Sequence, residues 1–515
     1  MSELHGVETL EYVSGALAIT TVSTAIIGLV GTAPDAQPAV AASGESGSWL
    51  LDTRLRFTAV TPGAAGNVLK VVARAGAGTA SLTTEDKAPL VSEAPDSVPL
   101  QLAEASVTAA QWEATTGTLS ISLATGDDGA VTATAQQVVD AIAAVADSGI
   151  TATLADGQTG DGVLSPFSLT LSGGEDEPFP LNTPVVVAGG IGQAAKLGTA
   201  GTLYAELNDI FDQFGALVVV VRADSDDDAD KQRAAVLAAL DGLVTSRTVT
   251  TYQPRILIAP AFSDDDAVAK ALETKAAKLR AITYIDSAPG ATVQAVVQRR
   301  NTFGERVELL RPRVQVADSD GQRVYRPYSA RAAGLRARID NQKGWWWSKS
   351  NQDIYNILGV EQPEDWSLSD ANSTTNLLNM DNVSTIIRHD GFKHWGNRLC
   401  STHPQLRFES VRRTADIIED SIQEAMMPYI DMPLDKWVRD DIIDTINSYL
   451  RKLTTLKAIF GGRAWLNAEL NTAETLAAGE LWIDYDFGPK SPLEKLTLTA
   501  NPTNNSYALA EMMAA

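Results

Sequence analysis

The sequence has 515 residues, of which 64 are acidic and 41 basic, for a formal net charge of −23. A chain of this length is expected to divide into two to four domains, and its 44% apolar content is ordinary for a soluble globular protein. The negative charge disfavours binding to nucleic acid or anionic lipid. The single cysteine, Cys400, excludes an internal disulfide and fits folding in a reducing cytoplasm.

We expect neither a targeting signal nor membrane insertion in the N-terminal segment. Residues 1–11 hold Glu3, Glu8 and Glu11 but no Lys or Arg, whereas a secretory signal peptide starts with positive charge. Residues 12–34 are uncharged, but they are rich in Thr, Ser, Gly and Ala and poor in large apolar side chains. This composition predicts a buried strand rather than a membrane helix.

The segment at residues 36–177 differs in composition from the rest of the chain. It holds 17 acidic and five basic residues, a net charge of −12, and it is rich in Ala, Thr, Ser and Gly. Alternating apolar residues predict a strand at 119–124, and helical spacing predicts an amphipathic helix at 135–148. We therefore expect a separate, solvent-facing, β-rich outer domain here.

Strands and helices alternate after residue 183. Runs of β-branched residues, separated by helical periods, predict short buried strands at residues 216–221, 254–260, 281–286 and 306–312. Acidic clusters at 225–230 and 263–266 stand where helix N-caps and first-turn acids are favourable. This rhythm predicts an α/β domain with a mostly parallel, buried sheet.

A glycine pattern, Gly190-x-Gly192-x-x-Ala195, matches the dinucleotide-binding fingerprint and follows a predicted strand. The fingerprint needs an acid about 20 residues further on, at the end of the second strand. The first such acid here is Asp224, which comes late, and no hydride-transfer partner accompanies it. We favour a glycine-rich turn and keep a nucleotide-dependent oxidoreductase as the alternative from another functional class.

No metal site is predicted. Asp224, Asp226 and Asp228 are spaced like the start of a calcium loop, but Ala229 and Ala235 stand where that loop needs Gly and Glu. Neither C-x-x-C nor H-E-x-x-H occurs, so we expect structural roles for the clustered soft side chains His389, His394, Cys400 and His403. We expect no cofactor and no catalytic residue.

Two segments, at residues 328–352 and 386–401, are dense in Trp, Arg and Gly. Large cationic and apolar side chains without a nucleophile–base pair are typical of protein–protein contacts. Three consecutive Trp residues at 345–347 cannot all face one way, which favours a core or subunit contact over a carbohydrate platform. Beyond them, the patterns predict helices at 411–426 and 438–450 and strands at 480–488 and 494–500.

An ordered set of motifs resembles the contractile phage tail sheath proteins, of the short type found in temperate myophages. The motifs are HGVETLEYVSG near the start, FPLNTPVVV, PRILIAPAF, AAGLRARIDNQKGWW, IIRHDGFKHWGNR, RRTADIIEDSI and GELWIDYDFGPKSPLEKLTLT. The resemblance covers residues 5–34 and 178–507, and the acidic insertion departs from it.

The resemblance implies a structural, non-enzymatic subunit that polymerises helically around the tail tube and contracts to drive the tube into the host cell envelope. Its implied partners are further copies of itself, the tail tube protein, and baseplate and tail terminator proteins. It implies a location in the virion tail after folding and assembly in the host cytoplasm. The alternative within the same fold is the sheath of a phage-like bacteriocin or of another contractile injection system.

The expected fold is a multidomain α/β protein in three parts. Residues 1–22 and 326–515 form an inner α+β assembly domain built from both termini, with terminal strand arms. Residues 23–35 and 178–325 form a middle α/β domain, and residues 36–177 form the inserted acidic outer domain.

The resemblance also implies site residues. Strands exchanged between subunits are expected at Val7, Thr9, Leu10, Glu11, Tyr12, Leu496, Thr497, Leu498 and Thr499. The packed framework of the inner domain is expected to include Gly334, Arg338, Asp340, Gly344, Trp346, Gly391, Trp395, Gly396 and Arg398. Arg412 and Arg413, on the predicted helix at 411–426, are the candidate contacts with the tube.

Overall fold

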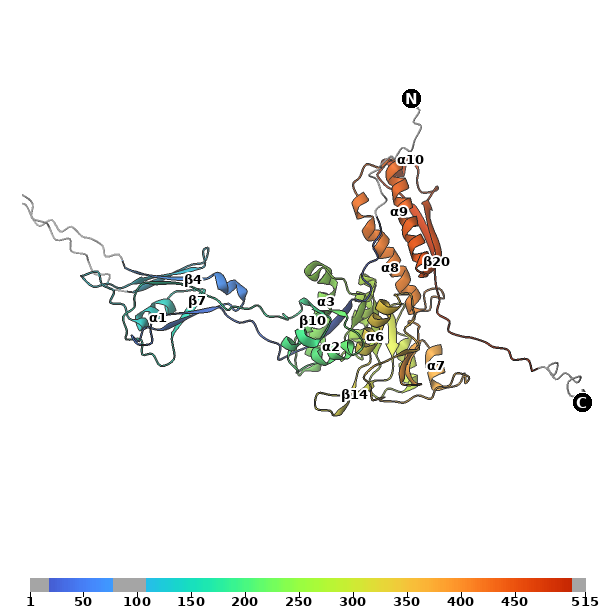
Figure 1. Ribbon diagram of the computed structural model, residues 1–515, viewed down its shortest axis with the longest axis horizontal. Helices are drawn as coiled ribbons and strands as arrows, with labels where there is room; N and C mark the ends of the chain where they lie inside the picture. The colour runs from blue at the N-terminus through green and yellow to red at the C-terminus, as the bar shows by residue number, and fades with distance from the viewer. Residues whose placement is uncertain (1–17, 77–107, 503–515) are drawn as a thin grey trace, which may run out of the picture. The chain divides into compact units, whose positions relative to one another are not determined.

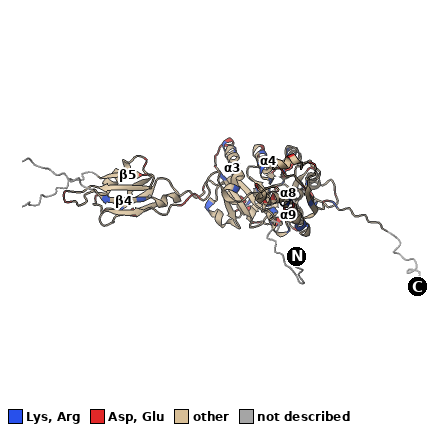
Figure 2. Ribbon diagram, turned by 90° about the horizontal axis from the view of Figure 1, so that it is seen from above, with Lys and Arg blue, Asp and Glu red and all other residues tan. Residues whose placement is uncertain are grey.

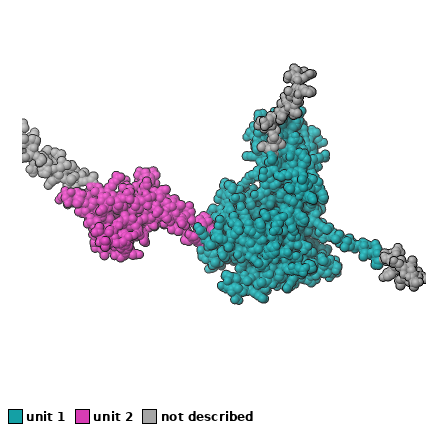
Figure 3. Space-filling model, in the orientation of Figure 1, with its two compact units in different colours: residues 1–35, 181–515 teal, residues 36–180 magenta. Residues whose placement is uncertain are grey.

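The computed structural model describes residues 18–76 and 108–502. Two compact units are present (Figure 3): the larger draws on residues 1–35 and 181–515, and the smaller is formed by residues 36–180. The smaller unit is therefore inserted into the chain of the larger one.

The larger unit is built on a sheet that contains nine strands of the described chain. Five of its neighbouring pairs run parallel and three antiparallel, so the sheet is mostly parallel, as the alternation of elements predicted. In spatial order the strands are β16 (Gln352–Asp353), β19 (Phe392–Trp395), β18 (Val383–Arg388), β13 (Val307–Leu310), β12 (Ile282–Asp286), β11 (Ile256–Ile258), β1 (Ile27–Thr32), β10 (Leu217–Ala223) and β9 (Pro184–Ala188).

The strand β1 lies inside this sheet, between β10 and β11. All six of its residues are buried, and it comes from the uncharged N-terminal stretch. No described helix is both long and apolar enough to cross a membrane. The strand prediction for this stretch is thus confirmed over residues 27–32.

Helices cover both faces of the sheet (Figure 1). The pair α3 (Ala229–Thr250) and α4 (Asp266–Leu279) packs on one face, where Val30 joins their apolar cluster. The pair α2 (Leu203–Phe211) and α6 (Ser329–Gln342) packs on the other, and the short α5 (Val293–Arg300) links β12 to β13. Asp228 and Asp265 cap α3 and α4, as the acidic clusters predicted.

A small three-stranded sheet and a short helix accompany the main sheet. They are β15 (Arg323–Arg326), β14 (Val314–Ala317), β17 (Gly359–Val360) and α7 (Thr374–Met380). The main sheet itself takes β16, β18 and β19 from beyond residue 326, where an inner domain was expected to begin. The division into inner and middle domains stays a prediction.

The last described elements form a two-helix subdomain, residues 409–489. The helices α8 and α9 pack against a β20–β21 hairpin around an apolar cluster that includes Ile418, Ile422, Tyr449 and Leu450 (Figure 1). The elements are α8 (Glu409–Ala425), the 3₁₀ turn η3 (Met427–Tyr429), α9 (Lys436–Thr455), β20 (Ile459–Leu466), α10 (Ala473–Ala477) and β21 (Ile483–Pro489).

In its described residues the smaller unit has two sheets and its own apolar core, to which Phe57, Leu119 and Ile121 contribute. The predicted strand at 119–124 is β6, and the predicted helix at 135–148 is α1, which ends at Ala143. The basic residues of β4, Lys70 and Arg74, are exposed; Figure 2 marks the basic positions on this strand in blue. The elements are β5 (Ala109–Glu113), β6 (Thr118–Leu123), β4 (Lys70–Ala75) and β8 (Phe167–Thr170), then β2 (Ser43–Ser46), β3 (Leu55–Ala59), β7 (Ile150–Leu154), α1 (Ala135–Ala143) and the 3₁₀ turn η1 (Ala64–Val68).

Candidate functional site

The helix α6 is buried from Ser329 to Asp340, although three of these residues are arginines. Its Ala and Gly residues let neighbouring elements approach closely. A Cβ added at Gly334 would lie 2.5 Å from the carbonyl oxygen of Ile210 on α2, which is too short for any real contact. Gly334 therefore sets how closely α2 and α6 pack.

Gly334→Ala is expected to destabilise the larger unit by about 1–3 kcal/mol, because the new methyl group meets backbone that cannot move alone. Urea unfolding followed by Trp fluorescence would measure this change. Gly192→Ala is the control, since a Cβ there meets no protein atom within 4 Å. Equal stability of the two variants would contradict the tight packing of α2 on α6.

Six charged side chains form a central ionic cluster between α6, β13 and α8. Its members are Glu308, Arg336, Asp340, Lys349, Glu409 and Arg413. Each is at least nine-tenths buried. Three carboxylates meet three cations, so the cluster is formally neutral, which is the condition for burying charge in a protein core.

The contacts in the central ionic cluster are short and directional. Lys349 bridges two carboxylates: its Nζ pairs with Glu308 and lies 3.0 Å from Oε2 of Glu409. Asp340 bridges two guanidinium groups, at 2.7 Å from Arg336 and 2.6 Å from Arg413. These contacts tie the start of α8 to α6 and to the sheet.

Electrostatics keep the acids of the cluster ionised. Burial alone would raise the pKa of Glu409, but Lys349, Arg336 and Arg413 together hold it far below its ordinary value. Burial would also raise the pKa of Asp340, but the neighbouring Arg336 and Arg413 outweigh this effect and lower it. These two acids thus stay ionised at neutral pH.

His394, expected to be structural, lies at the edge of the cluster and is fully buried. Its Nδ1 is 2.7 Å from the Tyr328 hydroxyl, and its Nε2 is 3.2 Å from Oε1 of Glu308. Desolvation lowers the pKa of the imidazole, although Glu308 opposes the change. His394 is therefore neutral and part of the packing between α6 and β19.

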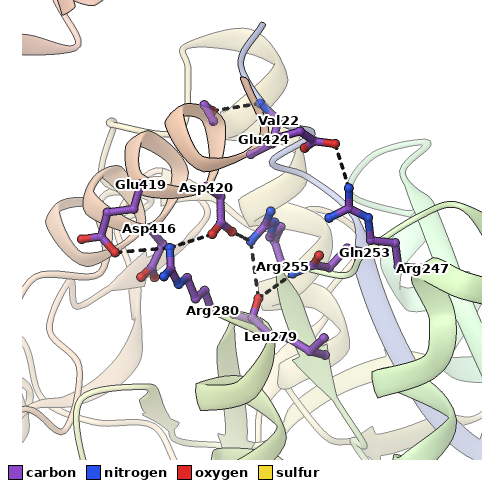
Figure 4. A network of polar contacts seen from close by, with 12 residues as sticks. Val22, Arg247, Gln253, Arg255, Leu279, Arg280, Asp416, Glu419, Asp420 and Glu424 are labelled. Atoms are coloured by element: carbon purple, nitrogen blue, oxygen red, sulfur yellow. Dashed lines mark hydrogen bonds and ion pairs between the residues drawn. The ribbon is translucent and has the colours of Figure 1, made fainter. Parts of the chain in front are cut away.

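A second row of ion pairs joins α8 to the ends of α3, α4 and the sheet strands (Figure 4). Acids spaced one helical turn apart on α8 each form an ion pair with an arginine from the part of the unit that contains the main sheet. The pairs are Arg306–Asp416, Arg255–Asp420, Arg280–Asp420 and Arg247–Glu424. This row holds the two-helix subdomain to the sheet.

The candidate tube contacts Arg412 and Arg413 are turned inward. They are 9% and 2% exposed, and their guanidinium groups lie 2.6 Å from Asp416 and from Asp340, respectively. Side chains bound to internal carboxylates are not available to a partner. The burial contradicts the expectation of a tube contact at these two residues.

The expected framework residues around the Trp run lie together. Trp345 and Trp346 pack edge to face with ring centroids 4.7 Å apart and join the apolar cluster of α9, whereas Trp347 is half exposed. Gly344 has a positive φ of 103°, and a Cβ there would strike the Trp346 ring. Arg338 stacks 3.8 Å from the Tyr355 ring centroid.

The other framework residues lie on and after the β18–β19 hairpin. Gly391 is in its turn, and Trp395 on β19 packs edge to face with Trp366 at 5.7 Å between centroids. Gly396 follows with a φ of 151°. Arg398 forms a bidentate salt bridge with Glu494, with Nε–Oε1 and Nη2–Oε2 distances of 2.7 and 2.5 Å. The hairpin is thereby connected to the C-terminal segment.

The C-terminal segment after β21 is extended, and it is exposed from Leu493 through residue 502 (Figure 1). The strand predicted at 494–500 is not formed within the described chain, because no neighbouring strand pairs with it. Leu496 and Leu498 are 68% and 83% exposed. Thr497 and Thr499 are exposed between and beyond them.

The N-terminal exchange residues, Val7 to Tyr12, lie outside the described residues. The segment that follows them is held against the two-helix subdomain. The amide of Val22 donates to Ser421 Oγ at 3.1 Å, and the hydroxyls of Thr21 and Tyr449 are 3.2 Å apart.

The Gly190 turn does not belong to a dinucleotide-binding unit. Its strand β9 runs antiparallel to β10, whereas the fingerprint requires a parallel βαβ unit. The turn opens a 3₁₀ segment at Ile191–Leu197 instead of an α-helix. The oxidoreductase alternative loses the structural context on which it depended.

The acidic and soft side chains considered as metal ligands have other partners. Asp228 caps α3, and Asp226 accepts from the amide of Asp228. Cys400 is buried, and desolvation raises the pKa of its thiol to about 12. In the described ranges, no group of three or more His, Cys, Asp or Glu residues is placed to hold a metal.

Comparison with known proteins identifies the class of protein. Residues 232–398 match the family model for the phage tail sheath protein central domain, and residues 401–503 match that for the phage tail sheath C-terminal domain. The central ionic cluster joins residues from both matched regions.

Individual tail sheath proteins are similar to this chain in sequence. The tail sheath protein of Escherichia phage P2 is 36% identical over 356 residues, which cover 66% of this chain and 90% of the relative. The major tail sheath protein of Serratia phage KSP20 is 34% identical, over 64% of this chain and 88% of the relative.

The fold is shared with a solved structure. The helical sheath of the anti-feeding prophage in its contracted state matches with a TM-score of 0.51 at 20% identity, over 62% of this chain and 89% of that one. The chain belongs to the phage tail sheath family, and the resemblance stated from its motifs is confirmed.

Proposed function

We propose that copies of this chain polymerise helically around a tail tube and contract to drive the tube into the host cell envelope. The observation that carries this proposal is the identity to a phage tail sheath protein over nine-tenths of that relative. The further partners we propose are the tail tube protein, and the baseplate and tail terminator proteins at the ends of the sheath.

Strand exchange between copies is the proposed assembly contact. The described C-terminal segment is paired with no described strand, and in its sequence the exposed Leu496 and Leu498 alternate with Thr497 and Thr499. The hairpin of β20 and β21 has two strands and open edges in the described chain, so it can accept an added strand. We propose the same role for residues 7–12 at the N-terminus.

A head-to-tail exchange of this kind builds an open helix instead of a closed dimer. Main-chain pairing tolerates rotation of the rigid bodies that it connects, so the lattice stays joined while lateral contacts change. Contraction then follows as new lateral contacts form. The buried ionic cluster and the Trp-rich framework fit a subunit that moves as a rigid body.

We propose that the three expected domains have distinct roles in this assembly. Residues 1–22 and 326–515 would surround the tube, and residues 23–35 and 178–325 would form the middle layer. The acidic residues 36–177 would form an outer domain that maintains solubility or contacts the cell surface. Folding and assembly in the host cytoplasm fit the single cysteine, and the finished location is the virion tail.

Leu496→Asp with Leu498→Asp is expected to abolish polymerisation and leave the monomer folded, because both side chains are exposed before assembly. Electron microscopy and sedimentation would show monomers in place of long hollow cylinders. Thr497→Ser with Thr499→Ser is the matched control and should polymerise normally. Normal cylinders from the Asp variant would rule out C-terminal strand exchange.

The sheath of a phage-like bacteriocin or another contractile injection system remains the second candidate, favoured by the structural match to the anti-feeding prophage sheath. The test is the gene neighbourhood. Capsid genes beside this one would favour a phage, and their absence from a complete tail cluster would favour the other candidate.

A further inference from the structure

The connection between α8 and α9 exposes an unusual amount of apolar surface. Five large apolar side chains within residues 427–437 define this tip surface. They are Met427, Ile430, Met432, Leu434 and Trp437, between 38% and 73% exposed. Single exposed apolar residues are normal, but a contiguous group marks a surface that a partner covers.

A second exposed apolar group lies at the other end of α9. Leu456 is 50% exposed and Phe460 is 74% exposed; together they define the base surface. The helix α9 has 20 residues, which corresponds to about 30 Å between its ends. The tip surface and the base surface are therefore separate and can be occupied at the same time.

The two surfaces carry opposite charge at their rims. Exposed Asp431 and Asp435 flank the tip surface and outnumber its one exposed cation within residues 427–437, Lys436. Exposed Lys452 and Lys457 flank the base surface, and a third cation, Lys490, lies 5.2 Å from the Phe460 ring centroid.

Helix-dipole preferences favour acids at the start of a helix and bases at its end. They do not account for Asp431, Lys457 and Lys490, because these three residues lie outside α9. The acidic residues around the tip surface are therefore complementary in charge to the lysines around the base surface, as expected for the two sides of one contact.

We propose that the tip surface of one copy docks on the base surface of a second copy. A second copy is the occupant because the chain itself carries the complementary surface, apolar at its centre and of opposite charge at its rim. The contact uses two different surfaces, so it is head-to-tail and propagates along a helical polymer. The inference rests on the proposed function, since it takes polymerisation as given.

The test compares three double variants of the full chain. Met427→Gln with Ile430→Gln alters the tip surface, and Leu456→Gln with Phe460→Thr alters the base surface. The control alters an exposed apolar pair on α7, Leu377→Gln with Met380→Gln. All three should show the unfolding transition of the wild type, because the side chains they replace are exposed.

Both the tip and the base variant are expected to raise the protein concentration needed for polymerisation by about tenfold, and the control is expected not to. In an equal mixture of the tip and base variants, the intact tip surface of one variant meets the intact base surface of the other, so pairs of copies should form at a lower concentration than in either variant alone. Light scattering and sedimentation would measure these concentrations.

Three outcomes would overturn the inference and identify the reason. Polymerisation of both variants at the wild-type concentration would show that neither surface joins copies. A tip variant that polymerises normally but fails to bind tail tube would place the tube on the tip surface. Impairment of the tip variant alone would indicate a tip-to-tip contact. If the wild type itself never polymerised, the proposed function would fail as well.

Discussion

Lys349→Met is expected to lower the free energy of unfolding of the larger unit by about 3–5 kcal/mol, one of the two largest single-residue effects we predict. Lys349 is fully buried between Glu308 and Glu409, and its removal leaves two carboxylates in the core without their shared cation. Methionine keeps most of the volume, so the loss reports charge and not a cavity. Urea unfolding followed by Trp fluorescence would measure it.

The pH dependence of this loss separates charge from packing. In the wild type, after the opposing effect of burial, Lys349 lowers the pKa values of Glu308 and Glu409, so their stabilising contribution is present at neutral pH and lost in acid. The difference in the free energy of unfolding between the wild type and Lys349→Met should therefore become smaller as pH falls. Lys343→Met removes an exposed lysine and should change stability by less than about 1 kcal/mol. A deficit that is constant with pH would contradict the ionic role of Lys349.

Glu206→Gln is expected to stabilise the larger unit at neutral and alkaline pH. Glu206 on α2 is 5% exposed and faces the acids Asp209 and Asp286. Burial raises the pKa of its carboxyl from 4.5 to about 8, with smaller contributions from these acids. Ionising the carboxyl in place therefore costs folding free energy that a neutral amide of the same shape avoids.

The sign of this effect follows from linkage. Between about pH 4.5 and pH 8 the folded state holds a proton that the unfolded state has lost, so wild-type stability falls as pH rises through this window. At about 1.4 kcal/mol per pKa unit, the variant should gain roughly 3 kcal/mol at pH 7 and little at pH 5. Glu469→Gln removes an exposed carboxylate as the control. Equal gains at pH 5 and pH 8 would contradict the raised pKa.

The α/β part of the fold was predictable because its strands are short β-branched runs that stay buried on both faces. The strands at residues 217–223 and 282–286 fall within two residues of their predicted bounds. The N-caps Asp228 and Asp265 were visible as acids just ahead of apolar periods. These are local signals, and local signals can be read from one sequence.

The central ionic cluster was not predicted, because its members are far apart in the chain. Within this cluster, the pair of Arg336 and Asp340 is local, four residues apart on one helix, but it was not predicted from the sequence. Arg412 and Arg413 lie opposite the apolar face of α8, so the helical pattern placed them toward solvent. Instead, Arg413 binds Asp340 on α6. Arg412 binds Asp416 on α8 itself, and Asp416 also binds Arg306, just before β13. Periodicity does not reveal Asp340 or Arg306, because they come from other parts of the chain.

The strand expected at 494–500 failed for a different reason. Its alternation of Leu and Thr is typical of a strand, but a strand exists only when a neighbour supplies hydrogen bonds. In the described chain Glu494 is fixed by Arg398, and the residues after it have no such neighbour. A sequence pattern can specify a strand whose partner is on another molecule.

The insertion of the smaller unit between β1 and β9 has a consequence for how the chain folds. The buried strand β1 pairs with β10 and β11, so Ile27 finds its partners at Val218 and Ile256. Such distant pairing slows folding, since a long loop must close before the sheet gains its contacts. The inserted unit has its own apolar core, so its earlier collapse during synthesis would shorten that loop and bring β1 closer to the strands with which it pairs.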